Sequence, residues 1–242
     1  MELVRNLPYS SIAGGLQYQS KTRPNNRAIL YPDPNKNFIE YASLTYKQYD
    51  NVTNHLADKI SHHLSSYSME EPITCALLAV GGIEYLLSQY SLLKLSNVIM
   101  FPISARNSPA AIEHLLKETK SKLLLTTSVY FPIIKTIQEE QNQLKDLTVL
   151  LLDSELFQID ELLKNKDIEY RNTSKFLKDR INKSEEELNQ VVVILHSSGS
   201  TSYPKAIRVT NRYFLLGFTL YSTTPDKHFW QENDVTLAWG AL

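Results

Sequence analysis

The sequence from Val191 to Ile207 reads VVVILHSSGSTSYPKAI. Its first five residues are aliphatic, which predicts a buried β-strand that ends close to Leu195. Hydroxyl side chains follow, together with Gly199, where the backbone is free to approach a ligand closely, and then Lys205. Backbone amides in such a turn can converge on an anion, hydroxyl groups add donors, and a lysine supplies positive charge. The segment therefore indicates a phosphate-binding loop at the carboxyl end of a strand.

The segment could also be a P-loop or an ordinary surface loop. The spacing is not that of a P-loop NTPase, because Lys205 follows a proline and no glycine stands directly before it. A polar, serine-rich loop after a buried strand is also a common surface feature, and composition alone favours that interpretation. The order of the residues carries more information than their composition.

That order, Ser-Ser-Gly-Ser-Thr and then Tyr-Pro-Lys after one further residue, resembles the phosphate loop of the adenylate-forming enzymes. These are the acyl-CoA synthetases, luciferases and adenylation domains of peptide synthetases. The residues that match the family pattern in register are Ser198, Gly199, Ser200, Thr201, Pro204 and Lys205. Ser202 and Ala206 stand where the family usually has glycine. A serine held at positive φ would strain the turn by roughly 1 kcal/mol or more.

Segments outside the loop extend the resemblance over most of the chain. They comprise residues 43–46, 101–108 and 115–119. Residues 196–198 and 210–213 are most similar to the fungal peptide-synthetase-like carboxylate reductases. In that branch the segment that corresponds to 101–108 commonly has a proline where Ala105 stands. The chain is thus identified as resembling the N-terminal part of an adenylate-forming enzyme.

The resemblance implies a chemistry and a set of site residues. A carboxylate attacks the α-phosphorus of ATP to give an acyl adenylate and pyrophosphate, and a thiol, from coenzyme A or a carrier-protein phosphopantetheine arm, then takes the acyl group. The cofactors implied are ATP and Mg²⁺, with the Mg²⁺ ligand expected outside this chain. The nucleotide phosphates would be held by Ser198, Gly199, Ser200, Thr201, Ser202 and Lys205. His196 is an accessory candidate, although capping the strand end is the favoured role for it. No residue is assigned as catalytic, and no metal ligand is assigned.

The chain reaches Leu242 without the family's later Tyr-Gly-x-Thr-Glu element, its ribose-binding aspartate or its mobile C-terminal domain. We therefore expect an N-terminal fragment that is not active alone. The alternative is a catalytically dead, truncated module that binds a nucleotide or another protein, and a loop that binds some other anion is a third interpretation.

Composition limits the remaining classes of function. The chain has 242 residues, 43% of them apolar, and a formal net charge of −1, so it can form a core and gives no electrostatic reason to expect a nucleic-acid partner. Its one cysteine, Cys75, lies in an apolar run and is expected to be a buried thiol. No signal-peptide core and no apolar stretch of spanning length is present, so the expected compartment is the cytoplasm.

Short apolar runs alternate with amphipathic segments between residues 41 and 242, which predicts an α/β fold with a parallel sheet flanked by helices. The expected strands are 73–80, 98–101, 122–126, 147–152 and 191–195. The expected helices begin at 45, 83, 109, 132 and 212. Residues 1–40 are expected to form an extended arm with one short strand at 28–31, and residues 164–190 a polar connector. Residues 41–242 would then be an incomplete AMP-binding domain, with its phosphate loop at 196–206.

Overall fold

A computed structural model describes residues 4, 7–33, 39–67, 71–140, 144–154, 157–171, 177, 184–197 and 203–223, the last six of these as backbone only. The described part is built around a six-stranded sheet with the strand order β6-β5-β3-β4-β7-β8. The strands are β3 (Ile73–Leu78), β4 (Val98–Pro102), β5 (Leu123–Thr126), β6 (Thr148–Leu151), β7 (Val191–His196) and β8 (Ala206–Thr210).

The first five of these strands are parallel, and β8 runs antiparallel to β7. The expected α/β class is confirmed, with the correction that the sheet is mixed at one edge. Strand β8 was not predicted, because exposed Ile207 and Arg208 interrupt the apolar pattern. An antiparallel edge strand pairs on one side only, so it does not need the continuous apolar run of a strand buried on both faces.

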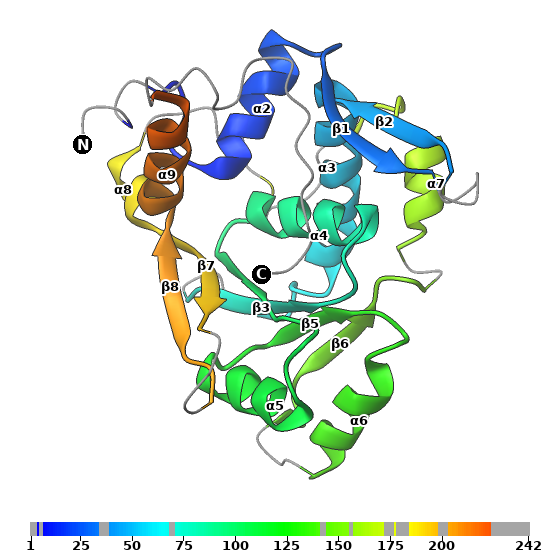
Figure 1. Cartoon of the computed structure of the whole chain (residues 1–242), viewed down its shortest axis with the longest axis vertical. Helices are drawn as coiled ribbons and strands as arrows, with labels where there is room; N and C mark the ends of the chain where they lie inside the picture. Colours follow the sequence, from blue (N-terminus) through cyan, green and yellow to red (C-terminus); the bar gives the residue numbers. More distant parts are fainter. Residues whose placement is uncertain are drawn as a thin grey trace.

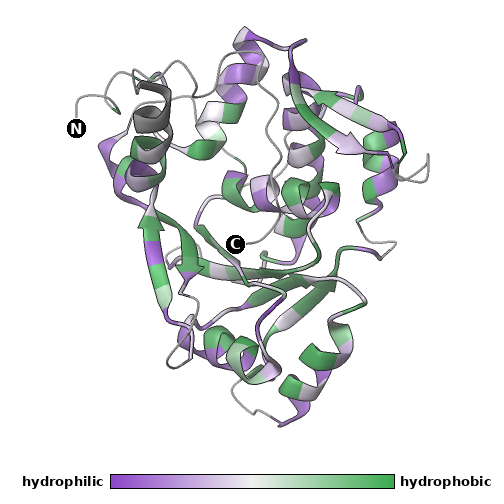
Figure 2. Cartoon of the chain, viewed as in Figure 1, coloured by the Kyte–Doolittle hydropathy of each residue, from purple (hydrophilic) through white to green (hydrophobic). Residues whose placement is uncertain are grey.

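Helices cover both faces of the sheet (Figure 1). They are α3 (Tyr46–His62) and α4 (Ile83–Lys94) on one face, and α5 (Pro109–Glu118) and α6 (Phe131–Glu140) on the other. Each of the five parallel strands divides its side chains between two hydrophobic cores: in β3, Cys75 and Leu77 belong to the core under α3 and α4, and Ala76 and Leu78 to the core over α5 and α6. This period-two alternation explains why the central strands read as continuous apolar runs and appear hydrophobic in Figure 2.

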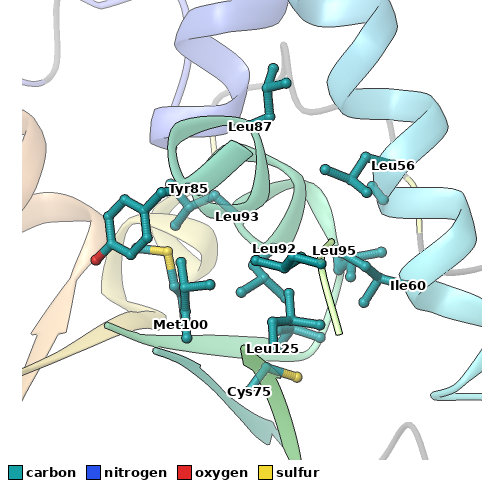
Figure 3. Close-up of a cluster of buried hydrophobic side chains, with 14 of the residues drawn as sticks. Leu56, Ile60, Cys75, Tyr85, Leu87, Leu92, Leu93, Leu95, Met100 and Leu125 are labelled. Atoms are coloured by element: carbon teal, nitrogen blue, oxygen red, sulfur yellow. The ribbon is translucent and has the colours of Figure 1, made fainter. Parts of the chain in front are cut away.

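The larger core joins α3 and α4 to the sheet. Leu56 and Ile60 from α3 and Leu92 from α4 meet Met100 and Leu125 from the strands below (Figure 3). Cys75 lies in the same cluster, and burial raises the pKa of its thiol, so it stays protonated and packs as a small apolar side chain. No helix in the described ranges is long and apolar enough to cross a membrane.

The helix starts follow from capping residues in the sequence. Thr45 closes a capping box at the start of α3, since its hydroxyl accepts from Gln48 N at 3.2 Å and the Gln48 side chain accepts from Thr45 N at 2.9 Å. Ser108 caps α5 by accepting from Ala111 N at 3.3 Å, with Pro109 in the first helical position. Both starts were expected, and both are confirmed.

The N-terminal region differs from expectation, because it contains a helix. Residues 12–22, within the expected extended arm, form α2 (Ile12–Thr22), which packs against α3 and α4. The strand expected at 28–31 is present as β1 (Arg27–Pro32) and pairs with β2 (Tyr41–Thr45) in a hairpin. Helix α2 buries mainly small residues, Ala13 and Gly14 beside Leu16, so its apolar stripe is weak in the sequence.

Three more helices complete the described chain: α7 (Ile159–Lys164), α8 (Glu185–Asn189) and α9 (Asn211–Thr223). The expected connector thus ends in a short helix. Helix α8 is held by a Ser184 cap and buries only Leu188, and a single buried position gives no periodic signal.

One charged side chain, Lys94 on α4, lies inside the α3–α4 interface with 1% of its surface exposed. Its ammonium group donates to the main-chain oxygen of Asp50 at 2.7 Å, to Asp50 Oδ1 at 2.7 Å and to Asn54 Oδ1 at 2.8 Å. All three donors of Lys94 are therefore satisfied. Burial lowers the pKa of Lys94 from its ordinary 10.5 to about 8, and the ion pair with Asp50 acts in the opposite sense but does not offset it.

This lowered pKa predicts a pH-dependent stability. Above pH 8 the folded Lys94 has lost its proton, while the unfolded chain keeps it up to 10.5, so unfolding takes up a proton and becomes less favourable as the pH rises through this window. We expect the free energy of unfolding of the wild-type chain, relative to Lys94→Met, to rise by about 1–2 kcal/mol between about pH 7.5 and 9.5. Denaturant titrations of both chains at the two pH values measure this, and a difference that does not change with pH would contradict it.

Candidate phosphate-binding site

The candidate site lies at the edge of the sheet where the parallel strands end. Strand β7 ends at His196, next to the turn that follows β4, and open α/β sheets bind their ligands at this edge. The predicted loop residues Ser198, Gly199, Ser200, Thr201 and Ser202 lie outside the described residues. The structure describes the two arms of the loop, which end at Ser197 and begin again at Tyr203.

His196 joins the end of β7 to the turn after β4. Its Nε2 atom accepts from the main-chain amide of Ser104 at 3.0 Å, and Nδ1 is 3.0 Å from the carbonyl oxygen of Ser197. These partners assign the neutral tautomer with the proton on Nδ1. The ring stands edge-on to Phe101, with 6.3 Å between the centroids. Both ring nitrogens are therefore engaged by the protein. This geometry is that of a side chain that holds the end of β7 in place.

The two arms are closed against each other by a reciprocal pair of hydrogen bonds. The amide of Ser197 donates to the carbonyl of Lys205 at 3.1 Å, and the amide of Lys205 donates to Ser197 Oγ at 3.0 Å. Pro204 is buried, whereas Lys205 is exposed. No carboxylate among the described residues forms an ion pair with the Lys205 ammonium group. The loop thus presents a lysine whose main chain is fixed and whose charge is available.

Helix α5 contributes two contacts to the second arm that the sequence did not indicate. The Glu118 carboxylate accepts from the amide of Ala206, at 3.4 and 3.3 Å from its two oxygens. The ring of His114 stacks on that of Tyr203, with 5.0 Å between centroids and 22° between planes. Both side chains lie on the polar face of an amphipathic helix. Glu118 belongs to the segment 115–119 that resembles the family, but no motif in the sequence connects either residue to the loop.

Asp153 ties together the ends of β5 and β6. Its carboxylate accepts from the amide of Ser128 at 3.0 and 2.9 Å and from the Ser128 hydroxyl at 2.5 Å. Burial acts to raise the pKa of Asp153, but the hydrogen bonds from Ser128 outweigh it and hold the pKa below its usual value. The described residues contain no group of three or more His, Cys, Asp or Glu side chains that could hold a metal ion.

The arrangement can therefore bind an anion, but its described groups do not form a nucleophile–base pair. Lys205 follows a hydroxyl-rich segment in sequence, and the imidazole of His196, at the end of β7, is occupied on both nitrogens. An exposed cation on a fixed main chain suits a ligand whose negative charge increases during a reaction.

Comparisons with known proteins identify the family and the fold of this chain. A family model described as AMP-binding enzyme matches residues 16–242. No curated protein sequence matches the chain. Among solved structures, a long-chain-fatty-acid-CoA ligase (FadD1) from Archaeoglobus fulgidus is 18% identical with a TM-score of 0.64, over 89% of this chain and 41% of that chain.

Two further structures are similar. The N-terminal domain of FACL13 from Mycobacterium tuberculosis is 19% identical with a TM-score of 0.60, over 84% of this chain and 44% of that chain. The anthranilate CoA ligase AuaEII, solved with anthranoyl-AMP, is 18% identical with a TM-score of 0.62, over 88% and 36% of the two chains. The present chain spans less than half the length of each, and at this identity the likeness concerns the fold.

Proposed function

We propose, on the premise that this chain belongs to the AMP-binding enzyme family, that it is the N-terminal part of a ligase that activates a carboxylic acid with ATP. The product of this step is an acyl adenylate, from which the acyl group passes to a thiol. The observation that carries the proposal is the pair of hydrogen-bonded arms, Ser197 and residues 203–206, at the carboxyl end of β7. They present the exposed ammonium group of Lys205, which forms no ion pair with the described carboxylates, next in sequence to a run of hydroxyl residues.

The loop residues take the roles that their chemistry allows. We assign hydroxyl donors to Ser198, Ser200 and Thr201, close backbone approach to Gly199, and positive charge to Lys205. Ser202 completes the set of phosphate-binding residues, and its amide is the group it would offer. The accessory role considered for His196 becomes an indirect one, because its ring nitrogens hold Ser104 and Ser197.

These residues would act on the leaving group of the reaction. A carboxylate oxygen forms a bond to the α-phosphorus of ATP, the bond from that phosphorus to the bridging oxygen breaks, and pyrophosphate leaves with the negative charge. Lys205 and the loop amides stabilise that charge as it develops. The resemblance implies that the later Tyr-Gly-x-Thr-Glu element supplies the ligand of the Mg²⁺ that accompanies ATP, so we assign that ligand to a region outside this chain.

The finer assignments rest on the sequence motifs. Residues 196–198, 101–108 and 210–213 favour the branch of the fungal peptide-synthetase-like carboxylate reductases, whose acceptor thiol is a carrier-protein arm, with coenzyme A as the second candidate. We assign residues 41–242 to the incomplete AMP-binding domain and residues 1–40 to the segment that precedes it. A reducing compartment, the cytoplasm, suits the buried free thiol of Cys75.

Calorimetric titration of the chain with MgATP tests the proposal. We expect saturable binding at one site, competed by inorganic tripolyphosphate and not by adenosine, because the loop holds the phosphates. Absence of binding would contradict the proposal and favour a module that interacts with another protein. Competition by adenosine but not by tripolyphosphate would show that the chain recognises the nucleoside and not the phosphates, and would contradict the role assigned to this loop.

A further inference from the structure

We infer that His114 and Glu118 are positioning residues that hold the lysine-bearing arm of the loop, residues 203–206, against α5. We call this pair the α5 clamp. The inference rests on the proposed function, since it explains how Lys205 is oriented toward phosphate, and it adds to the loop two residues from a distant element.

The clamp stands on a rigid support. Helix α5 is capped by Ser108, and its opposite face buries Leu115 and Leu116 in the core below the sheet. His114 and Glu118 are four residues apart, so they lie on one face of the helix, and His114 Nε2 is 3.5 Å from Glu118 Oε2. The packing of α5 therefore fixes the positions of both side chains relative to residues 203–206.

Each member of the pair contacts a different end of the arm. Glu118 accepts from the amide of Ala206, the first residue of β8, which is an edge strand. His114 stacks on Tyr203 at the other end, and Pro204, between them in sequence, is buried. A stacked ring pair and a charge-assisted hydrogen bond are contacts of different kinds, so their effects can be removed separately.

Lys205 lies between the two contacts and is held from a third direction by Ser197. Its main chain is therefore fixed by β7 on one side and by α5 on the other, while its side chain stays exposed. A lysine on a fixed main chain loses less conformational freedom when it binds an anion than one on a loose loop. The clamp raises affinity by this pre-organisation, without touching the nucleotide.

The negative charge of Glu118 argues against direct contact between this side chain and the nucleotide. A carboxylate close to a phosphate site repels the ligand, so Glu118 favours binding only through the hydrogen bond that it accepts. Glu118→Gln keeps an acceptor oxygen and removes the charge, whereas Glu118→Ala removes both. In the same way, His114→Phe keeps a stacking ring, and His114→Ala does not.

Two measurements on the chain test the clamp. Hydrogen exchange of the amides of residues 203 and 205–210 should be faster in Glu118→Ala and His114→Ala and close to wild type in Glu118→Gln and His114→Phe, with equal denaturation midpoints as the control for folding. Titration with MgATP should show affinity about three- to tenfold weaker in the two alanine variants, and wild-type or higher affinity in the glutamine and phenylalanine variants.

The outcomes distinguish the clamp from the function on which it rests. Binding of ATP that is lost in Lys205→Ala but equal to wild type in both alanine variants would overturn the clamp and leave the proposed function standing. Loss of affinity in Glu118→Gln as great as in Glu118→Ala would also overturn it, because the charge and not the hydrogen bond would then matter. Absence of ATP binding by the wild-type chain would remove both proposals, whatever the exchange data show.

Discussion

Replacing Lys205 with alanine is expected to weaken binding of MgATP to the chain by about 10- to 100-fold, which corresponds to the loss of hydrogen bonds between an ionised donor and phosphate oxygens. Lys205 is the only lysine or arginine between residues 196 and 207. The main chain at this position is held by Ser197 through its own amide and carbonyl, which alanine retains. The substitution should therefore remove charge and leave the loop closed.

Two controls make this result specific. Lys205→Arg keeps the charge and should retain a larger share of the affinity, although a guanidinium does not reproduce the point charge of an ammonium group. Lys47→Ala removes an exposed lysine from the first turn of α3, far from the start of β8 in Figure 1, and should bind MgATP as the wild type does. Equal affinity in Lys205→Ala and Lys47→Ala would reject the assigned role of Lys205. In a longer protein that contains this chain, Lys205→Ala should likewise abolish carboxylate-dependent exchange of pyrophosphate into ATP.

The parts of the fold that the sequence predicted are those in which a local pattern and the tertiary environment agree. Strand β3 is buried on both faces and reads as a continuous apolar run, and α3 begins at a capping box, so both have a signal at the level of single residues. Helix α2 and strand β8 lack such a signal. The first buries small residues against α3 and α4, and the second is stabilised by pairing with β7, an interaction between strands that the sequence of β8 alone does not encode.

The candidate site likewise has features that the sequence predicted and features that it did not. The positions of Lys205 and His196 relative to the end of β7 followed from sequence order, because both are within ten residues of the strand. The hydrogen bond from Ser104 to His196 joins residues 92 positions apart, and that from Ala206 to Glu118 joins residues 88 apart. Contacts of this kind depend on how β4 and α5 are arranged around β7, and no short motif specifies them.

Replacing Asp50 with alanine is expected to lower the free energy of unfolding by about 3–5 kcal/mol, the usual cost of leaving one member of a buried ion pair without its partner. Lys94 is 1% exposed and receives its charged contact from Asp50 Oδ1 at 2.7 Å. With the carboxylate gone, the ammonium group keeps only the main-chain oxygen of residue 50 and Asn54 Oδ1 as partners. Urea denaturation near neutral pH measures the loss, and a change below about 1 kcal/mol would show that the pair is not needed for stability.

The complementary substitution should cost less, because the two charges are not equally buried. The Asp50 side chain is 18% exposed against 1% for Lys94, so a carboxylate left alone can be hydrated where an ammonium group cannot. Lys94→Met should therefore be less destabilising than Asp50→Ala. The double variant should be more stable than the sum of the single effects predicts, since Met removes the buried charge that Asp50→Ala leaves unpaired. Strictly additive effects would mean that Lys94 and Asp50 act independently, and would contradict the view that their ion pair is what allows a lysine to occupy the α3–α4 interface.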